Sequence, residues 1–111
     1  MLGDRVGHSV SPAIHNAGFD AIGADLVYVA CPVAVTRFAE AMSGLHALGA
    51  VGANVTVPHK EAAFELAESL GPMARAAGAV NTLVRTPTGW SGHNTDVDGF
   101  RTPLQALGAS L

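Results

Sequence analysis

The sequence has 111 residues, which suits one compact domain, and 49% of them are hydrophobic, so we expect a buried core and no extended disorder. Only 14% are charged, and the net charge of −3 comes without a cluster of lysine or arginine, which argues against nucleic-acid binding. No apolar run reaches the ~18 residues of a membrane span and no signal peptide begins the chain, so we expect a cytoplasmic protein without membrane contact. The single cysteine, Cys31, excludes an internal disulfide and is interpreted as a small core residue.

The first half of the chain predicts a helix, a strand and a second helix. After a loop, the first helix has Ser11 as N-cap, Pro12 in the first helical position and Gly23 as its end. Residues 26–30, LVYVA, are apolar throughout, which predicts a strand buried on both faces. Residues 35–49 predict a helix ending at a glycine. One apolar stripe is expected on each helix, formed by Ile14, Gly18, Ala21 and Ile22 in the first and by Phe38, Met42, Leu45 and Leu48 in the second.

The second half continues the alternation. Residues 51–57 predict a strand that ends at Pro58, and residues 60–71 predict a helix. Residues 79–85 and 90–95 predict two strands around the turn TPTG. The tail from residue 96 is helical in character, but Pro103 should break it, so we expect a second helix start with Thr102 as cap. The inward side chains of the helix at 60–71 are expected to be Ala63, Phe64, Ala67 and Leu70.

This order of elements predicts the α/β class, with a mostly parallel sheet flanked by helices. The first strand is the exception to the pattern. Only the residues MLG precede the loop at Asp4, whereas a central strand typically has ~5–6 residues. We therefore expect a truncated first strand and a chain that is cut at both ends.

Four polar segments lie where strands end or loops begin, and ligands bind at the carboxyl ends of strands in such sheets. They are GHSVSP at 7–12, NVTVPHK at 54–60, GAVNT at 78–82 and GHNTDVDG at 92–99. Together they supply hydroxyls, amides, the carboxylate of Asp96 and the ammonium of Lys60, which is the only lysine in the chain. This set suits a small ligand that is rich in hydroxyls and carries an acid group. A lysine paired with an aspartate can polarise a carbonyl or transfer a proton beside an alcohol.

Each residue also has a structural interpretation. Ser11 could serve as a helix cap alone, Asn54 and Asn94 could be turn residues, and Lys60 alone would be read as a solvated surface lysine. Histidines near the loops show no HxH or HExxH spacing, so no metal site is expected. These histidines are His8, His15, His59 and His93.

The segments GDRVGHSVSPAIHN, GANVTVPHK, GAVNT and GHNTDVDGF, in this order and spacing, resemble the successive signatures of shikimate dehydrogenase. That family interconverts 3-dehydroshikimate and shikimate with NADP in aromatic amino-acid biosynthesis, at a cleft between an N-terminal substrate domain and a C-terminal Rossmann domain. The resemblance implies that residues 1–111 are the substrate-binding domain. It also implies that NADP binds mainly to a Rossmann domain absent from the chain, in which G-x-G-x-x-G does not occur.

The resemblance further implies roles for individual residues. Ser9 and Ser11 match the paired serines that bind the substrate carboxylate. Thr56 matches a threonine that reaches a ring hydroxyl, and Asn81 matches an asparagine at the substrate hydroxyls.

Two matched residues are implied to be catalytic as well as substrate-binding. Lys60 matches the catalytic lysine and Asp96 matches its aspartate partner. The ammonium would lie beside the carbonyl that becomes an alkoxide, and would stabilise that charge or supply the proton.

Three alternatives remain open at this point. The substrate could be quinate or a related polyhydroxy acid, the chain could be a binding module for shikimate-like acids without redox chemistry, or it could be a folding-competent domain excised from a larger protein. The fragment alone is expected to be inactive. The oligomeric state is undetermined, with a dimer as one option.

Overall fold

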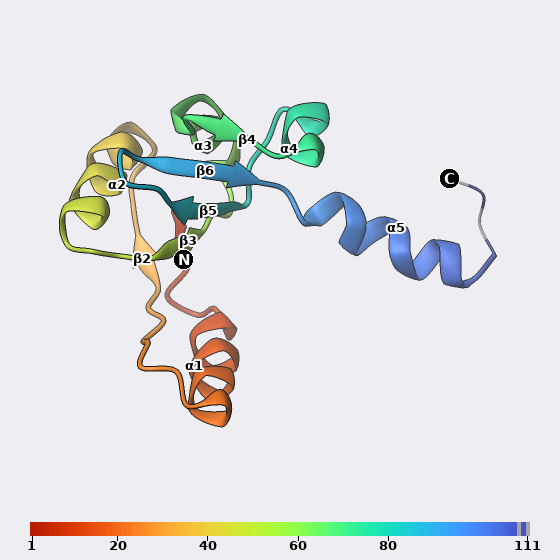
Figure 1. The fold of residues 1–111 in the computed structure, drawn as a ribbon, viewed down its shortest axis with the longest axis horizontal. Coiled ribbons are helices and arrows are strands. Elements are labelled where there is room, and N and C mark those ends of the chain that lie inside the picture. Colours follow the sequence, from red (N-terminus) through yellow and green to blue (C-terminus); the bar gives the residue numbers. More distant parts are fainter. Residues whose placement is uncertain (109, 111) are drawn as a thin grey trace.

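The computed structural model describes residues 1–108 and Ser110, and it contains two β-sheets with helices around them (Figure 1). In chain order the elements are β1 (Leu2–Gly3), α1 (Ser11–Ile22), β2 (Cys31–Pro32), the 3-10 helix η1 (Val35–Arg37), α2 (Phe38–Ala47), β3 (Gly52–Asn54), α3 (Lys60–Leu66), β4 (Ser69–Leu70), α4 (Pro72–Ala77), β5 (Thr82–Arg85), β6 (Trp90–His93) and α5 (Asp96–Ala106). The expected α/β class is confirmed. Within the described residues, no helix is long and apolar enough to cross a membrane.

The larger sheet has the strand order β3-β5-β6-β4, and the smaller sheet pairs β1 with β2. Strand β5 runs antiparallel to both β3 and β6, whereas β4 with β6 and β1 with β2 are parallel. The strands are therefore mixed, which corrects the expectation of a mostly parallel sheet. The predicted turn at 86–89, where the Thr86 N–H donates to the Gly89 carbonyl at 2.9 Å, accounts for the antiparallel pairing of β5 with β6, because so short a turn joins only antiparallel neighbours. A parallel bridge between Leu2 and Val55 connects the two sheets.

The hydrophobic core lies where helices α2, α3 and α4 meet the larger sheet. Phe38 and Met42 of α2 are buried as their spacing predicts, and Leu45 of the same stripe is half-buried. Leu48 is instead 85% exposed, because α2 ends just before it and the chain then turns at Gly49 with a φ of 86°. The buried core consists of Leu2, Phe38, Met42, Ala53, Val55, Ala63, Ala74, Val80, Leu83 and Trp90.

The prediction of a buried strand at residues 26–30 is wrong. The strand is β2, which begins at Cys31 opposite Leu2 of the two-residue β1. Residues 26–30 precede this pairing, and the side chains of Val27 and Val29 are 77% and 54% exposed. The apolar character of this segment indicated burial, but among the described residues no neighbouring element covers both of its faces.

Helix α1 begins at Ser11, one residue before the predicted first helical position at Pro12, and it has the predicted end at Gly23, which adopts a φ of 70°. Ser11 is not the N-cap, however. Val10 holds that position, and the Ser11 N–H donates to the Ser9 Oγ at 3.1 Å, so the serine two residues earlier satisfies the helix start.

The apolar face of α1 is not buried as predicted, since Ile14 is 64% and Ile22 is 78% exposed. The helix projects from the sheets (Figure 1) and is held by polar contacts to the segment before β2. The Asn16 side chain bonds both the N–H and the carbonyl of Tyr28, at 2.7 and 2.9 Å, and the His15 ring stacks on the Tyr28 ring at 4.2 Å. Few apolar contacts therefore anchor this helix.

The predicted helix at 60–71 divides into α3, the strand β4 and the residue that precedes α4. The chain leaves the helix after Leu66, and the Glu68 N–H and Gly71 N–H donate to the carbonyls of Trp90 and Gly92 at 2.9 Å. These bonds place β4 beside β6 as an edge strand, and tertiary pairing overrides a favourable helical pattern at this point.

The expected break at Pro103 is also wrong, because α5 runs without interruption through it. Proline removes one helical N–H, whose acceptor would be the carbonyl of Gly99. Gly99 is exposed, as is most of α5, so water can bond the freed carbonyl. Thr102 lies inside the helix and does not cap a second one.

Candidate functional site

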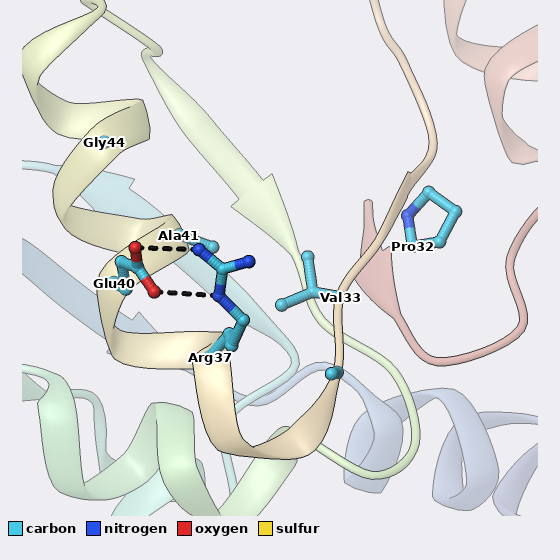
Figure 2. Close-up of a pocket in the computed structure, with 7 residues that line it drawn as sticks. Pro32, Val33, Arg37, Glu40, Ala41 and Gly44 are labelled. Atoms are coloured by element: carbon cyan, nitrogen blue, oxygen red, sulfur yellow. Dashed lines mark hydrogen bonds and ion pairs between the residues drawn. The ribbon is translucent and has the colours of Figure 1, made fainter.

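A hollow of about 530 Å³ lies beside α2 and is lined in part by Pro32, Val33 and Gly44 (Figure 2). Its charged side chains are Arg37 and Glu40, which bond each other through two contacts of 2.9 Å and are both 67% exposed. An exposed pair that neutralises itself offers little to a ligand. The polar residues singled out in the sequence lie elsewhere, at one edge of the larger sheet.

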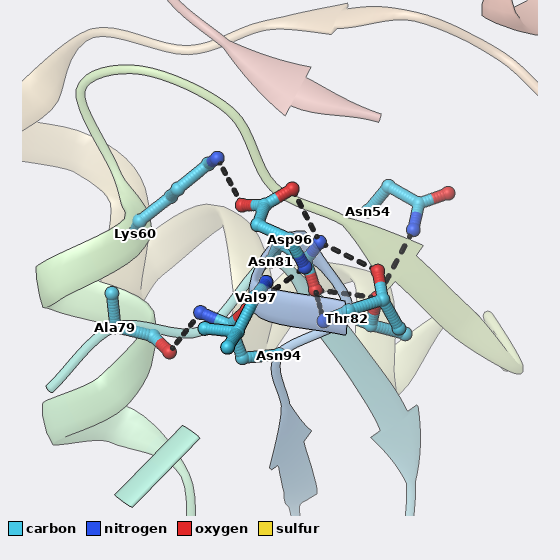
Figure 3. Close-up of polar contacts among 9 residues, drawn as sticks. Asn54, Lys60, Ala79, Asn81, Thr82, Asn94, Asp96 and Val97 are labelled. Atoms are coloured by element: carbon cyan, nitrogen blue, oxygen red, sulfur yellow. Dashed lines mark hydrogen bonds and ion pairs between the residues drawn. The ribbon is translucent and has the colours of Figure 1, made fainter. Parts of the chain in front are cut away.

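That edge is where β3 and β6 end and where β5 begins. Asn54 lies opposite Thr82 across the first pairing, and Thr82 lies opposite His93 across the second. Helices α3 and α5 begin beside the same edge with Lys60 and Asp96, and Figure 3 shows their side chains pointing toward one another. The antiparallel hairpin therefore brings together three of the polar segments that are far apart in the sequence.

Lys60 and Asp96 form the charged centre of this cluster. The Lys60 Nζ lies 2.5 Å from the Asp96 Oδ2, and the two side chains are 33% and 53% exposed. The hydrogen bond from Lys60 lowers the pKa of the Asp96 carboxyl, partial burial opposes this, and the charge of Lys60 lowers it further. Asp96 also lies in the first turn of α5, where the helix dipole favours a negative charge. Asp96 is therefore ionised at neutral pH.

Asn81 orients this carboxylate from the loop before β5. Its Nδ2 donates to the Asp96 Oδ1 at 3.0 Å and to the Thr95 Oγ1 at 2.8 Å. Its Oδ1 accepts from the Thr95 N–H at 3.1 Å and from the Thr82 hydroxyl at 3.0 Å. Because both ends of the amide are engaged, its orientation is determined by its neighbours.

The hydrogen-bonded chain extends from Thr82 to Asn54, whose role the sequence left open, and to Tyr28, which the sequence did not single out. The Asn54 Nδ2 donates to the Thr82 Oγ1 at 3.4 Å, and the Tyr28 hydroxyl donates to the Asn54 Oδ1 at 2.9 Å. Burial raises the pKa of Tyr28. The positions of Asn54 and Thr82 as direct cross-strand neighbours are the signal that could have linked them, but only once the strand register was known.

Asn94 has the structural role that remained open in the sequence. It is 9% exposed, and its Oδ1 accepts from the N–H groups of Asp96 and Val97 at 2.9 and 3.2 Å, while its Nδ2 donates to the Ala79 carbonyl at 3.0 Å. It thus accepts hydrogen bonds from two N–H groups in the first turn of α5 and fixes the backbone that carries Asp96. In the part of the chain that the structure describes, no group of three acidic, histidine or cysteine side chains could hold a metal ion.

Hydrogen bonds and the ion pair among the described residues join three of the six residues named from the sequence, Lys60, Asn81 and Asp96. The other three make local contacts. The Thr56 N–H donates to the Leu2 carbonyl at 2.9 Å, and its methyl carbon packs so close to Gly3 that a Cβ added there would lie 2.5 Å away.

Ser9 and Ser11 occupy the loop and first turn of α1 and bond each other through the Ser11 N–H. Both are half-buried. The Asp4 N–H donates to the Val57 carbonyl at 3.3 Å, which ties the loop that carries Ser9 to the turn that follows β3. A backbone hydrogen bond therefore connects the loop that carries Ser9 to the segment that leads from β3 to Lys60.

The cluster combines a cation, an anion and neutral groups that both donate and accept hydrogen bonds. The Lys60 ammonium has three hydrogens, and the bond to Asp96 uses one of them. An oxygen placed beside Nζ would accept a charge-assisted hydrogen bond, while a hydroxyl could donate to the carboxylate of Asp96. This chemistry suits a carbonyl or alcohol flanked by hydroxyls.

Residues 1–83 match the family model described as the shikimate dehydrogenase substrate binding domain. A shikimate dehydrogenase (NADP(+)) of Anaeromyxobacter dehalogenans strain 2CP-1 is 54% identical over 108 residues, which are 97% of this chain and 39% of that protein. The chain thus spans about two fifths of the length of the curated relatives it matches.

Two solved structures show the same fold. Shikimate 5-dehydrogenase from Thermus thermophilus, in complex with NADP(H) and shikimate, has a TM-score of 0.87 at 33% identity, over 98% of this chain and 41% of that one. The ligand-free 5-ketofructose reductase of Gluconobacter sp. strain CHM43 has a TM-score of 0.88 at 31% identity, over 95% of this chain and 38% of that one.

Proposed function

The chain belongs to the family of shikimate dehydrogenase substrate-binding domains, and from this premise we propose that its polar cluster binds shikimate and 3-dehydroshikimate within an NADP-dependent shikimate dehydrogenase. The observation that carries the proposal is the contact of Lys60 with an Asp96 that Asn81 also bonds. An ionised pair beside neutral hydrogen-bonding groups is what a hydroxylated carbonyl substrate requires.

In this proposal each residue recognises one part of the substrate. The hydroxyls of Ser9 and Ser11 bind the carboxylate, which does not change during the reaction. Thr56 and Asn81 bind ring hydroxyls, and Asp96 accepts a hydrogen bond from a hydroxyl while it holds the lysine. The half-buried positions of Ser9, Ser11 and Thr56 support these roles, because each residue is partly exposed to a ligand.

Lys60 handles the proton at the reacting oxygen. When 3-dehydroshikimate is reduced, its carbonyl carbon gains a hydride and its oxygen gains a proton, and Lys60 Nζ is the donor of that proton or stabilises the alkoxide. In the opposite direction the nitrogen takes the proton from the alcohol. Asp96 remains ionised throughout and keeps the ammonium oriented, which agrees with the lowered pKa of its carboxyl.

NADP supplies the hydride chemistry when it is bound to the enzyme. A dinucleotide requires a glycine-rich turn between a strand and a helix for its pyrophosphate. Across residues 1–108 and 110, no segment between a strand and the helix that follows it contains more than one glycine. The described residues do not fit the dinucleotide, so the proposal assigns NADP to other parts of the enzyme and no step to it here.

A titration of the chain with shikimate, followed by NMR, tests the proposal. Each hydrogen bond to an exposed site contributes about 0.5–1.5 kcal/mol, so we expect a Kd on the order of 1 mM. Signals of residues 9–11, 54–60, 79–82 and 94–96 should shift. Asp96→Asn should abolish these shifts, whereas the matched control Glu40→Gln, which removes another exposed carboxylate, should leave them intact. A titration that moves none of the four segments would contradict the proposal.

A second candidate is the reduction of a different polyhydroxy carbonyl compound, and the similarity to a 5-ketofructose reductase is the observation that favours it. Quinate is a further acid of this kind. The serines distinguish acids from neutral ketoses, because their proposed partner is a carboxylate. Ser9→Ala should weaken the binding of shikimate and quinate but leave the binding of 5-ketofructose unchanged. Stronger binding of the neutral ketose by the unaltered chain would favour the second candidate.

A further inference from the structure

His59 is fully buried, whereas the other histidines of the chain are exposed or half-buried. It immediately precedes Lys60 and holds the N-cap position of α3. The function proposed above gives it no part. Buried polar side chains are few in folded proteins, and each one calls for a physical reason.

The imidazole ring of His59 fastens the start of α3 to the segment around η1. Its Nε2 lies 2.7 Å from the Val33 carbonyl oxygen, and because a carbonyl can only accept, Nε2 carries the ring hydrogen. The ring also stacks on the ring of Phe38, with the centroids 4.9 Å apart and the planes 17° apart. Val33 lies just before η1 and Phe38 just after it.

The other ring nitrogen shows that stability alone does not account for a histidine here. The Nδ1 of His59 is buried and has no hydrogen-bond partner among the described residues. An unpartnered polar atom in a core costs stability, and an apolar ring would fill the same space without that cost. What the imidazole adds to an apolar ring is one directional bond, to the Val33 carbonyl. We therefore looked for what this bond positions.

The backbone on both sides of the His59–Lys60 peptide is held as firmly as the imidazole. The His59 N–H donates to the Thr56 carbonyl at 2.9 Å, and the His59 carbonyl accepts from the Ala63 N–H at 2.8 Å. The Lys60 carbonyl accepts from the Val80 N–H at 3.0 Å. With its backbone fixed in this way, Lys60 keeps freedom only in its side chain.

The position of the Lys60 backbone decides where its Nζ can lie. A long lysine side chain loses rotamer freedom when Nζ stays 2.5 Å from the Asp96 Oδ2. The two side chains are partly exposed, and an ion pair of this kind stabilises too little to hold a helix start in place. Something else must hold it, because a displacement of about 1 Å at a reacting group can cost on the order of 100-fold in rate.

We propose that His59 is the positioning residue of Lys60. Its ring, bonded to the Val33 carbonyl and stacked on Phe38, sets the direction in which α3 begins. That direction brings the Lys60 Nζ to Asp96 and to the reacting oxygen of the substrate. The catalytic consequence rests on the proposed function, whereas the contact of Lys60 with Asp96 can be measured in the chain without a ligand.

Two NMR signals of the ligand-free chain report on this contact. Lys60 is the only lysine, so its ε-methylene group gives a signal that no other lysine overlaps. The carboxyl carbon of Asp96 reports its pKa, which the hydrogen bond from Lys60 lowers. His59→Phe keeps an aromatic ring against Phe38 and removes the donor to Val33. We expect the pKa of Asp96 to rise toward its ordinary value and the two ε-methylene protons of Lys60 to approach one chemical shift.

Three further variants separate positioning from general stability. His59→Gln is the conservative variant, because its amide can donate to the Val33 carbonyl, and it should restore most of both signals. Met42→Val is the matched control, since it shortens another fully buried side chain of the same core; it should lower the melting temperature and move neither signal. Phe38→Leu removes the stacked ring and should change both signals in the same direction as His59→Phe, which keeps the test decisive if His59→Phe does not fold.

A shikimate titration separates this inference from the proposed function. His59→Phe should weaken shikimate binding by up to about tenfold, which is what one hydrogen bond contributes. If the unaltered chain binds no shikimate but His59→Phe still raises the pKa of Asp96, the proposed function fails and the positioning role stands. Unchanged Asp96 and Lys60 signals in His59→Phe and Phe38→Leu, or equal changes in Met42→Val, would overturn the positioning role.

Discussion

The replacement Asn81→Asp tests the geometry at the centre of the cluster. It keeps the Oδ1 oxygen that accepts from Thr95 and Thr82, and it exchanges the donor Nδ2 for a charged oxygen 3.0 Å from the Asp96 Oδ1. The shape of the side chain is unchanged. Any effect on stability therefore reports on the lost donor and one new repulsion.

The magnitude follows from that distance. Two unit charges at 3.0 Å repel by about 1.4 kcal/mol in a water-like medium, and by several times more in a less polar one. The Asp96 side chain is 53% exposed, so the lower value applies. The replaced Nδ2 donates to both the Asp96 Oδ1 and the Thr95 Oγ1, but the Thr95 hydroxyl can donate to the new oxygen instead, so the net loss is one hydrogen bond, about 0.5–1.5 kcal/mol. Lys60 remains on the other oxygen of Asp96 and offsets part of the repulsion, so we expect a destabilisation of about 1–3 kcal/mol near neutral pH.

Urea denaturation followed by fluorescence of the buried Trp90 measures the effect. The cost of Asn81→Asp should shrink at about pH 3, because a protonated carboxyl is neutral and donates its O–H where the amide donated N–H. Asn81→Ala is the control, since it loses the hydrogen bonds without adding a charge and its cost should depend little on pH. Equal costs for the two variants at both pH values would refute the geometry.

Three further predictions concern the same edge and its support. The pKa of Asp96 is lower in the folded state, so its pairing with Lys60 stabilises the fold above the unfolded-state pKa, and this contribution is lost as pH falls through the folded-state pKa. In Lys60→Met the free energy of unfolding should therefore depend less on pH in that range. Gly92→Ala would place a Cβ 2.7 Å from a methyl carbon of Val80, so we expect about 1–3 kcal/mol of destabilisation in urea denaturation. Gly3→Ala would place a Cβ 2.5 Å from two methyl carbons, one of them on the proposed ligand-binding threonine, so it should weaken shikimate binding in an NMR titration.

The sequence predicted the elements whose signals are local. The turn at 86–89 predicted the hairpin of β5 and β6, and the spacing of Phe38 and Met42 predicted the buried face of α2. The motif order predicted the family, and with it the meeting of Lys60 with Asp96, which are 36 residues apart. The first two features depend only on neighbouring residues in the sequence, and for the third the family resemblance indicates which distant residues meet.

The remaining features depend on which segments of the chain pack against each other in the fold. An apolar run such as residues 26–30 indicates burial only if neighbours cover both faces, and strand preference is decided by those neighbours. Pro103 is tolerated because its helix is exposed to water. The hydrogen bonds from Tyr28 through Asn54 to Thr82 require the register of β3 against β5, which no local pattern contains.

The weak anchoring of α1 divides the molecule into regions of unequal cooperativity. Opening α1 exposes little apolar surface, whereas opening β5 uncovers Leu83, which is fully buried between two neighbouring strands. Amide hydrogens of α1 should therefore exchange with solvent through local fluctuations, and those of β5 through global unfolding. Ser11 begins α1 and Ser9 lies just before it, whereas Lys60 begins α3, whose Ala63 belongs to the same buried core as Leu83. A ligand that contacts both the serines and Lys60 should slow the exchange of the α1 amide hydrogens toward the rate of those in the sheet.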